Sequence, residues 1–241
     1  MIREIPTKKM KVEIWSDVVC PFCYIGKRKF ESALQQFEGS ANVEVEWKSF
    51  LLDPAMKHVA GKKIHDVLAE KKGWSIEKAE QANQQVTQMA AEVGLKYDFD
   101  EVIPAGSFNA HKLTHLAAQY KLQDQATEKL FRAYFIEGKN IEDADTLVQL
   151  GVTIGLKEDE IKNVLATDQL SAEVKADAFE AEELGIRGVP FFVFDRKYAI
   201  SGAQPTEVFL SALQTTWAET QKESPALTTE NDVSCQINGN C

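Results

Sequence analysis

The sequence has few cysteines, no excess of basic residues and no long apolar run. Only 4 of the 241 residues are cysteine, which argues against a disulfide framework as the source of stability. There are 37 acidic residues against 27 lysines and arginines, and the formal net charge of -10 argues against general binding to nucleic acid or to an anionic membrane. No stretch approaches the roughly 20 apolar residues of a transmembrane helix. With 44% hydrophobic residues, the composition predicts a globular protein that acts on small molecules or on other proteins.

The start of the chain also lacks the features of a secretory signal. Residues 1–9 carry charges and a proline, but no apolar core of the roughly 7 to 15 residues that a signal peptide needs. We therefore expect a cytoplasmic protein. In that reducing compartment, a close pair of cysteines is more often reactive than structural.

One such pair, Cys20 and Cys23, encloses Pro21 and Phe22 where a strand pattern over residues 11–16 gives way to a helical pattern. The change of pattern places Cys20 near the N-cap and Pro21 at the first helical position, where a missing N–H costs nothing. Open backbone N–H groups and the helix dipole should then stabilise the Cys20 thiolate. Because Cys23 lies on the same helix face, we expect Cys20 to attack a substrate and Cys23 to resolve the mixed disulfide.

A structural zinc site is the alternative interpretation of this pair, because four-cysteine zinc sites also use CxxC units. Zinc knuckles usually place the unit in a turn between short strands. Here the pair opens a long helix and contains a proline, which favours redox chemistry. We therefore expect no bound metal, and thiol exchange requires no organic cofactor.

Strand periodicity occurs towards both ends of the chain. The segments that alternate as strands are residues 11–16, 43–50, 191–194 and 198–201, and a helical segment at 205–217 follows the last of them. Together with the helix after Cys23, they give the order β-α-β and then β-β-α. This order predicts an α/β thioredoxin-like fold with a mixed sheet, formed by residues 11–52 and 186–217 as one discontinuous domain.

The middle of the chain, residues 53–185, is predicted to be a large all-helical insertion. Its candidate helices are residues 62–72, 75–93, 107–120, 124–136, 143–154, 158–166 and 169–184. Ser75, Ser107 and Asp124 are candidate caps at helix starts, and a glycine follows most of the helix ends. Beyond the closing helix, residues 218–241 lose periodicity and are expected to form a polar C-terminal tail.

A second candidate feature is the proline directly before the third strand. X-Pro bonds adopt the cis form at low cost, and in a thioredoxin-like fold the Val189-Pro190 bond would lie across from the cysteine pair. We predict a cis bond there and expect the Val189 backbone to pair with an extended substrate. An ordinary trans proline at a strand start is the alternative. The predicted substrate-binding residues are Val189, Pro190 and Phe22.

These segments resemble a known family. Residues 16–28 (SDVVCPFCYIGKR), 188–194 (GVPFFVF) and 198–204 (YAISGAQ) resemble the FrnE branch of the DsbA-like thioredoxin superfamily, and the similarity spans about residues 11–217. The resemblance implies a cytoplasmic thiol-disulfide oxidoreductase with an all-helical insert. It also implies active-site residues at Cys20 and Cys23 and a cis-proline at Pro190. The chain departs from the family by having a phenylalanine, residue 22, where members often carry tryptophan.

The other two cysteines, Cys235 and Cys241, lie in the tail. A tight turn at Asn238-Gly239 could bring their sulfurs together. A flexible chain from the closing helix to Cys235 spans on the order of 24 Å, so the pair could reach Cys20. Two interpretations stay open: an auxiliary redox pair that exchanges with the main site, or an inert exposed pair.

Several charged residues near these motifs have simpler interpretations. His111 and His115 share a helix face and could hold a metal, but their apolar neighbours favour packing or hydrogen bonding. Residues 27–29 (KRK) favour a solvated face. Asp17 could assist or repel the Cys20 thiolate, depending on its geometry.

The sequence thus predicts a thiol-disulfide oxidoreductase that acts on protein or peptide thiols and disulfides, with glutathione as a further candidate partner. One alternative is a glutathione-using isomerase or transferase of the 2-hydroxychromene-2-carboxylate isomerase type, from the same superfamily. Those enzymes typically have serine where Cys20 stands and lack the second cysteine. The other alternative is a non-catalytic chaperone or zinc-binding module that uses the insert as a docking surface.

Overall fold

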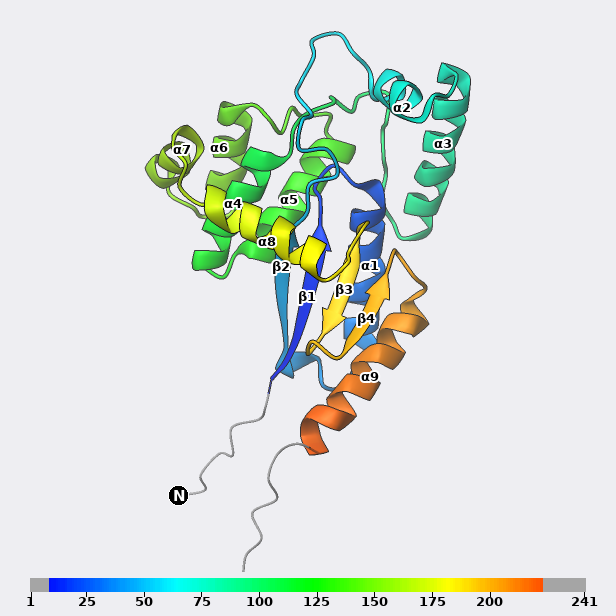
Figure 1. The fold of residues 1–241 in the computed structure, drawn as a ribbon, viewed down its shortest axis with the longest axis vertical. Coiled ribbons are helices and arrows are strands. Elements are labelled where there is room, and N and C mark those ends of the chain that lie inside the picture. Colours follow the sequence, from blue (N-terminus) through cyan, green and yellow to red (C-terminus); the bar gives the residue numbers. More distant parts are fainter. Residues whose placement is uncertain (1–8, 223–241) are drawn as a thin grey trace, which may run out of the picture.

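The computed structural model describes residues 9–222, which fold around a four-stranded sheet of order β2-β1-β3-β4 (Figure 1). The strands are β1 (Met10–Ser16), β2 (Val43–Ser49), β3 (Phe191–Phe194) and β4 (Tyr198–Ser201). β1 pairs in parallel with β2 and antiparallel with β3, and β3 pairs antiparallel with β4. This mixed sheet confirms the predicted thioredoxin-like fold class.

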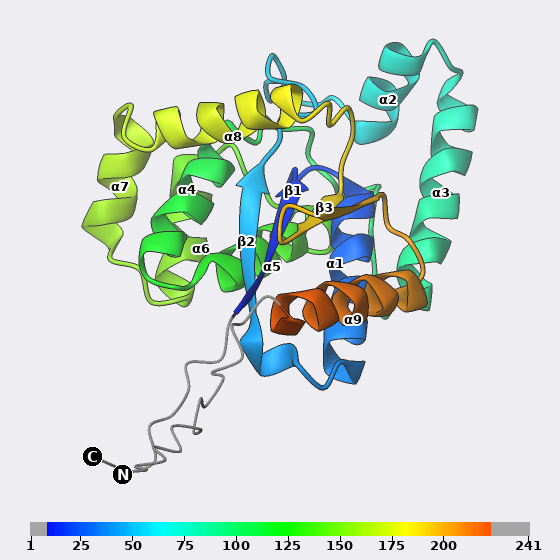
Figure 2. The ribbon, with the colours of Figure 1, turned by 60° about the horizontal axis from the view of Figure 1, so that its bottom comes forward.

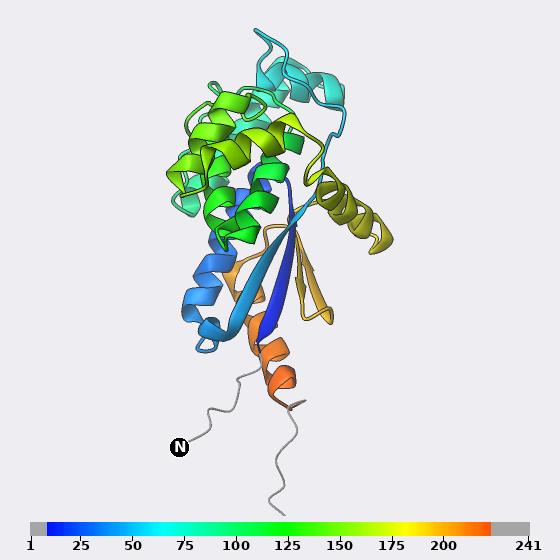
Figure 3. The same ribbon diagram turned by 90° about the vertical axis from the view of Figure 1, so that its left-hand side faces the viewer.

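The two faces of the sheet are covered differently. On one face, α1 (Pro21–Gln36) and α9 (Thr206–Lys222) pack side by side on an apolar cluster. Within this cluster the ring of Phe192 lies 5.5 Å from Phe30 and 4.6 Å from Phe209, measured between centroids. On the opposite face, α8 (Ser171–Glu183) covers the end of the sheet near the fully buried Trp15 (Figure 3). β1 and β3 therefore form the buried centre of the sheet, whereas β4 is exposed at three of its four residues.

The segment between β2 and β3 is helical, as predicted. Besides α8, its helices are α2 (Ile64–Lys72), α3 (Ile76–Glu92), α4 (Phe108–Gln119), α5 (Gln123–Phe135), α6 (Ala144–Thr153) and α7 (Glu158–Ala166). Figure 2 shows α2 and α3 on one side of the molecule and α4, α6 and α7 on the other. None of the helices within residues 9–222 combines the length and apolar character that crossing a membrane requires. The division into domains at residues 53 and 185 stays a prediction.

The helix starts differ in part from the predicted caps. Ser75 caps α3, because its hydroxyl accepts a hydrogen bond from the Lys78 backbone N–H at 3.3 Å. Ser107 stands at the N-cap of α4 without making such a bond, and Asp124 lies inside the first turn of α5. The predicted cap was therefore wrong for Asp124, whereas Ser107 occupies the predicted N-cap position. The Asp124 carboxylate instead accepts a hydrogen bond from Trp47 Nε1 at 3.1 Å, which ties α5 to β2.

The closing helix is longer than predicted, since α9 continues past residue 217 to Lys222. Two buried threonines allow this extension. Thr216 Oγ1 donates to the Ala212 carbonyl and Thr220 Oγ1 donates to the Thr216 carbonyl, at 2.8 and 2.9 Å. Polar residues that satisfy themselves inside a helix do not show the apolar periodicity by which helices are predicted. The tail cysteines, Cys235 and Cys241, lie outside the described residues.

Candidate active site

Both cysteines of the pair lie at the start of α1, as the sequence predicts. Cys20 is the N-cap residue, with extended φ and ψ of -92° and 113°, and Pro21 opens the helix. The Cys20 backbone N–H donates to the Asp17 carbonyl at 2.9 Å, which closes the short turn between β1 and α1. Cys20 and Cys23 are both free thiols, with 4% and 1% of their surface exposed. Phe22, between them, is 39% exposed.

The loop before β3 meets this helix start. The Val189-Pro190 peptide bond is cis, the isomer expected from the sequence. The Cys20 Sγ donates a hydrogen bond to the Val189 carbonyl over 3.5 Å, although the two residues are 169 positions apart. Gly26 lets the loop approach α1 closely, because a Cβ on this residue would lie only 2.9 Å from Pro190 Cγ. The structure therefore brings Cys20, Cys23, Val189 and Pro190 to one place.

The two thiols differ in their environment. Burial raises the pKa of the Cys23 thiol well above its ordinary value, and the side chain of Cys20 raises it further. The Ser16 side chain and the Asp17 backbone N–H act in the opposite direction, since both can donate a hydrogen bond to the Cys23 thiolate. At neutral pH the Cys23 side chain is consequently a protonated thiol.

The helical insertion contributes a tyrosine that the sequence analysis missed. Tyr97, in the loop between α3 and α4, donates a hydrogen bond from its hydroxyl to the Pro21 carbonyl at 2.8 Å. Burial raises the pKa of Tyr97, so this hydroxyl remains a donor. The ring stacks on Phe135 of α5 at a centroid distance of 4.8 Å. The sequence held one indication that this loop is buried, because the aromatic residues Tyr97 and Phe99 stand at alternate positions in a segment without helical periodicity.

Asp17 and His111 are both buried beside the site. The Asp17 carboxylate accepts hydrogen bonds from the backbone N–H groups of Val19 and Leu52, at 3.3 and 2.8 Å. Its Oδ1 also lies 3.4 Å from His111 Nε2. These two backbone N–H groups fix the orientation of the Asp17 carboxylate, which the sequence could not predict.

The second histidine of α4 has a structural role. His115 Nε2 lies 3.0 Å from Ser49 Oγ and 3.1 Å from Asp177 Oδ2. Burial opposes the charge of Asp177, but hydrogen bonds from His115 and Ser49 outweigh it and lower the pKa of that carboxyl. Within residues 9–222, no group of three or more histidine, cysteine, aspartate or glutamate side chains is arranged to hold a metal. Through these contacts His115 ties α4 to β2 and α8.

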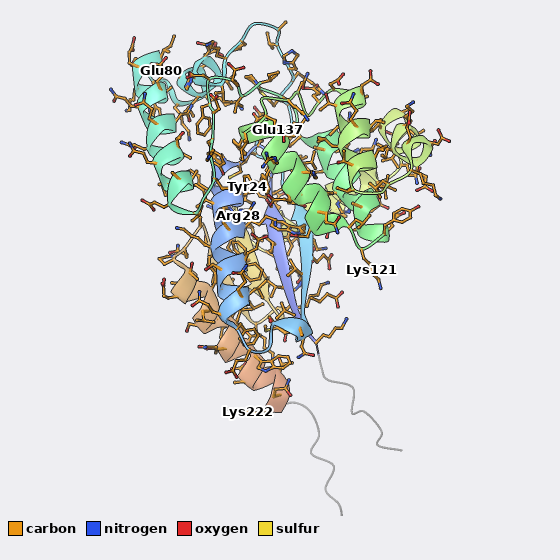
Figure 4. The ribbon with its side chains drawn as sticks, turned by 180° about the vertical axis from the view of Figure 1, so that it is seen from behind. Tyr24, Arg28, Glu80, Lys121, Glu137 and Lys222 are labelled. Carbon is orange, nitrogen blue, oxygen red and sulfur yellow. The ribbon has the colours of Figure 1, made fainter. Side chains whose placement is uncertain are left out.

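The basic residues after the cysteine pair do not form the solvated face that we expected. Lys27 is only 2% exposed, and its ammonium group is paired with Glu31, Asp124 and Glu128. Arg28 also pairs with Glu128, and its guanidinium lies 4.9 Å from the centre of the Tyr24 ring. Figure 4 shows this side of α1 next to the insertion. The prediction was wrong for Lys27 because two of the three carboxylates that pair with it, Asp124 and Glu128, lie about 100 residues away in α5.

A mostly apolar hollow of about 280 Å³ lies beside the cysteine pair. Its walls include Val19, Leu52, Ile64, Val67, Ala105 and Tyr134. Val19 directly precedes Cys20, so the hollow adjoins the turn that leads into α1. An apolar side chain of a substrate would be shielded from water there.

A sheet of this topology, with a cysteine pair at a helix start and a cis-proline against it, defines a thioredoxin-like protein. The chain belongs to the family of the DSBA-like thioredoxin domain, which matches residues 11–214. It is 30% identical over 205 residues to the uncharacterized protein YwbO of Bacillus subtilis (strain 168), covering 84% of this chain and 94% of that protein. The similarity places the chain among the thiol oxidoreductases and related isomerases.

Solved structures support the same family. The structure of the probable DsbA oxidoreductase SCO1869 from Streptomyces coelicolor superposes with a TM-score of 0.83 at 39% identity, covering 90% of this chain and 92% of that one. The cytosolic disulfide reductase DsbM from Pseudomonas aeruginosa, solved with GSH, has a TM-score of 0.55 at 17% identity and covers 88% of this chain and 98% of that one. At this lower identity the likeness shows the fold alone.

Proposed function

We propose that the protein exchanges disulfides with protein or peptide substrates, and that Cys20 and Cys23 carry the reaction. One observation supports this proposal above the others. The Cys20 thiol stands at the N-terminus of α1 and donates to the carbonyl of Val189, the residue before the cis-proline. A thiolate formed at this position would be stabilised by the open N–H groups of the helix start.

In the reducing direction, the Cys20 thiolate attacks one sulfur of the substrate disulfide. A Cys20–substrate disulfide forms, and the other substrate sulfur leaves as a thiolate. Cys23 then loses its proton and attacks Cys20 Sγ, which releases the second substrate sulfur as a thiolate. Two electrons pass from the cysteine pair to the substrate, and the Cys20–Cys23 disulfide is the product. The oxidising direction reverses each step.

Substrate binding is assigned to Val189, Pro190 and Phe22. An extended peptide that added itself beside Val189 would bring its own sulfur to Cys20, because the Val189 carbonyl already contacts Cys20 Sγ. The exposed ring of Phe22 and the apolar hollow beside Val19 would contact side chains that flank the substrate cysteine. Glutathione remains a further candidate, since the distant relative DsbM was solved with GSH.

The rival functions are less well supported. Isomerases of the 2-hydroxychromene-2-carboxylate type typically have serine at the position of Cys20, whereas this chain has two thiols, Cys20 and Cys23, at the helix start. A zinc-binding or purely chaperone function would not require the contact between Cys20 and Val189. Membership of the FrnE branch and a cytoplasmic location both stay predictions. Fractionation of cells that express the protein would test the location.

Reduction of insulin by dithiothreitol tests the proposal. We expect the wild type to accelerate the reaction and Cys20→Ser to fall to the uncatalysed rate. Cys23→Ser should accumulate a mixed disulfide at Cys20, because the resolving thiol is missing. The double variant Cys235→Ser/Cys241→Ser is the matched control, since it also removes thiols but leaves the pair in α1. Full activity of Cys20→Ser would contradict the proposal.

Zinc content and glutathione-dependent isomerisation of 2-hydroxychromene-2-carboxylate, measured on the same preparations, test the two alternative functions.

The Cys23→Ser variant also tests whether the tail pair exchanges with the main site. Under mild oxidation, a relay predicts a crosslink between Cys20 and Cys235 or Cys241. If no crosslink between Cys20 and either tail cysteine formed, the tail pair would be the inert pair of the second interpretation.

A further inference from the structure

The hollow of about 280 Å³ beside the cysteine pair is not apolar throughout. Two residues that line it carry hydroxyl groups, Ser107 at the start of α4 and Tyr134 near the end of α5. They are buried, with 5% and 2% of their surface exposed, and neither hydroxyl makes a hydrogen bond within residues 9–222. A buried hydroxyl without a partner is costly, so two of them in one hollow indicate a ligand that supplies the partner.

One side of this hollow adjoins the cysteine pair. Val19, the residue before Cys20, forms one wall, and Leu52, which is 48% exposed, forms another. The buried Asp17 carboxylate joins these two walls, because it accepts hydrogen bonds from the backbone N–H groups of both residues, at 3.3 and 2.8 Å. A peptide held with its sulfur at Cys20 would therefore place a neighbouring side chain in the hollow.

The size and the walls of the hollow favour one large side chain of a substrate. Sites for whole small molecules usually enclose roughly 300 to 1,000 Å³, and the hollow lies just below that range. Its apolar walls are formed by Val19, Leu52, Met56, Ile64, Val67, Leu68 and Ala105. Aromatic side chains gain most from burial in such surroundings, because they have the largest apolar surface. We therefore expect an aromatic side chain.

The charged residues around the hollow disfavour a charged tip on that side chain. Lys71 and Lys72 line the hollow and would repel a cation, although Lys71 is paired with Asp53. An anion is disfavoured deeper in, where burial and then the negative charge of Asp17 raise the pKa of Tyr134. This phenol stays neutral and is able to donate a hydrogen bond. A neutral tip that both accepts and donates would satisfy the two open hydroxyls together.

We propose that the hollow binds a tyrosine side chain of the protein or peptide substrate, close in sequence to the substrate cysteine. The inference rests on the proposed function, because it assigns a substrate preference to the same site. The aromatic ring packs against the aliphatic walls, and the phenol oxygen accepts a hydrogen bond from Tyr134 and donates one to Ser107. Phenylalanine would fill the same space but leave both hydroxyls open. Substrates with tyrosine are therefore preferred.

Single-cysteine peptides, each joined by a disulfide to a coloured aromatic thiol, test this preference in the full chain carrying Cys23→Ser, Cys235→Ser and Cys241→Ser. The Cys20 thiolate attacks the peptide sulfur, a Cys20–peptide disulfide forms, and the aromatic thiolate leaves. The peptides carry either tyrosine or phenylalanine, at each position near the cysteine in turn. At one position, we expect the tyrosine peptide to react on the order of 10-fold faster, the factor that one or two net hydrogen bonds contribute.

Removal of either hydroxyl should remove the preference. In Tyr134→Phe and in Ser107→Ala, we expect the ratio of the tyrosine rate to the phenylalanine rate to fall below about twofold. This ratio is independent of the thiol reactivity and of the folded fraction, which affect both peptides equally. Tyr120→Phe and Ser171→Ala are the matched controls. Tyr120 is exposed after the end of α4, Ser171 is buried at the start of α8, and neither lines the hollow, so both variants should keep the wild-type ratio.

Two results would overturn this inference. One is a ratio below about twofold at every peptide position in the parent protein, since the hollow would then hold only water or any apolar side chain alike. The other is a ratio that either Tyr134→Phe or Ser107→Ala leaves unchanged. If none of the peptide disulfides reacted faster with the parent protein than with the same chain carrying Cys20→Ser, the proposed function itself would be contradicted.

Discussion

Cys23 gives the stability of the reduced protein a pH dependence of defined sign. Burial, followed by the neighbouring Cys20, raises the pKa of its thiol above that in the unfolded chain. The folded state therefore holds this proton more tightly. The resulting stability is complete below the unfolded thiol pKa of about 8.5 and is lost as pH rises towards the folded pKa. We expect the free energy of unfolding to fall by up to about 1.4 kcal/mol per pH unit above about pH 8.5 from this residue alone.

Urea unfolding of the reduced wild type and of Cys23→Ala, measured from about pH 7 to about pH 10, isolates this contribution. Burial also raises the pKa values of Tyr24 and Tyr97, but both tyrosines are present in both proteins. The wild type should lose stability more steeply than Cys23→Ala above about pH 8.5. Parallel curves would show that the buried thiol does not titrate differently in the two states.

Single residues also show how far the sequence could predict the site. Cys20 and Cys23 could be placed because a helix start is a local pattern, and the cis bond at Pro190 because only X-Pro bonds adopt that isomer cheaply. The Tyr97 hydroxyl contacts α1 at a residue 76 positions away. His111 approaches Asp17, which is 94 positions away by residue number. No local periodicity reports such pairs. The same limit explains why the sequence did not predict the burial of Lys27.

At the scale of elements, helix bounds within the insertion were predicted to within about two residues, because most of these helices are amphipathic and a glycine follows most of their ends. The start of α8 is an instructive exception. Leu170, its N-cap, adopts a left-handed φ of 62°, which local propensity would not assign to leucine. Its side chain is buried in the main apolar cluster, so packing outweighs the backbone preference there.

The close approach of α1 to the loop before β3 predicts an unusual sign for Gly26→Ala. Glycine to alanine in a helix interior ordinarily stabilises by up to about 1 kcal/mol. Here the new Cβ would lie 2.9 Å from Pro190 Cγ and 3.5 Å from Phe192, so either α1 or the loop must shift. We expect a loss of about 1 to 3 kcal/mol in the free energy of unfolding, together with a slower attack by Cys20.

The exposed Gln35, on the same helix, supplies the comparison for this substitution. Gln35→Ala should change the stability by less than about 0.5 kcal/mol and leave thiol reactivity unaltered. Denaturant unfolding measures the stability, and the initial rate at which the reduced protein reacts with a chromogenic aromatic disulfide measures the reactivity of Cys20. A Gly26→Ala protein that is more stable than the wild type would show that the loop yields without cost.

At the scale of the whole molecule, the insertion and the thioredoxin-like part share one apolar core. Cys23, Tyr24 and Ile25 of α1 belong to the same buried cluster as residues of α4, α5, α6 and α7. The Tyr24 ring stacks on Phe131 at a centroid distance of 4.9 Å, and its hydroxyl donates to Glu128 at 2.6 Å. Because the insertion begins and ends beside the sheet, extensive contact between the two parts follows from their order along the chain. Which side chains form that contact could be learned only from the fold.

This shared core predicts that the two parts unfold together. Phe131→Ala lies in the insertion, but it removes the ring that packs against Tyr24 and should destabilise the whole protein by about 3 to 5 kcal/mol. Far-UV circular dichroism follows mainly the helices, while fluorescence includes the buried Trp15 and Trp47 of the sheet. We expect both signals to shift to the same lower urea midpoint, with coincident curves before and after the substitution. If Phe131→Ala lowered only the dichroism midpoint and left a separate fluorescence transition in place, the insertion would be an independently folding unit, and the packing around α1 would not couple it to the cysteine pair.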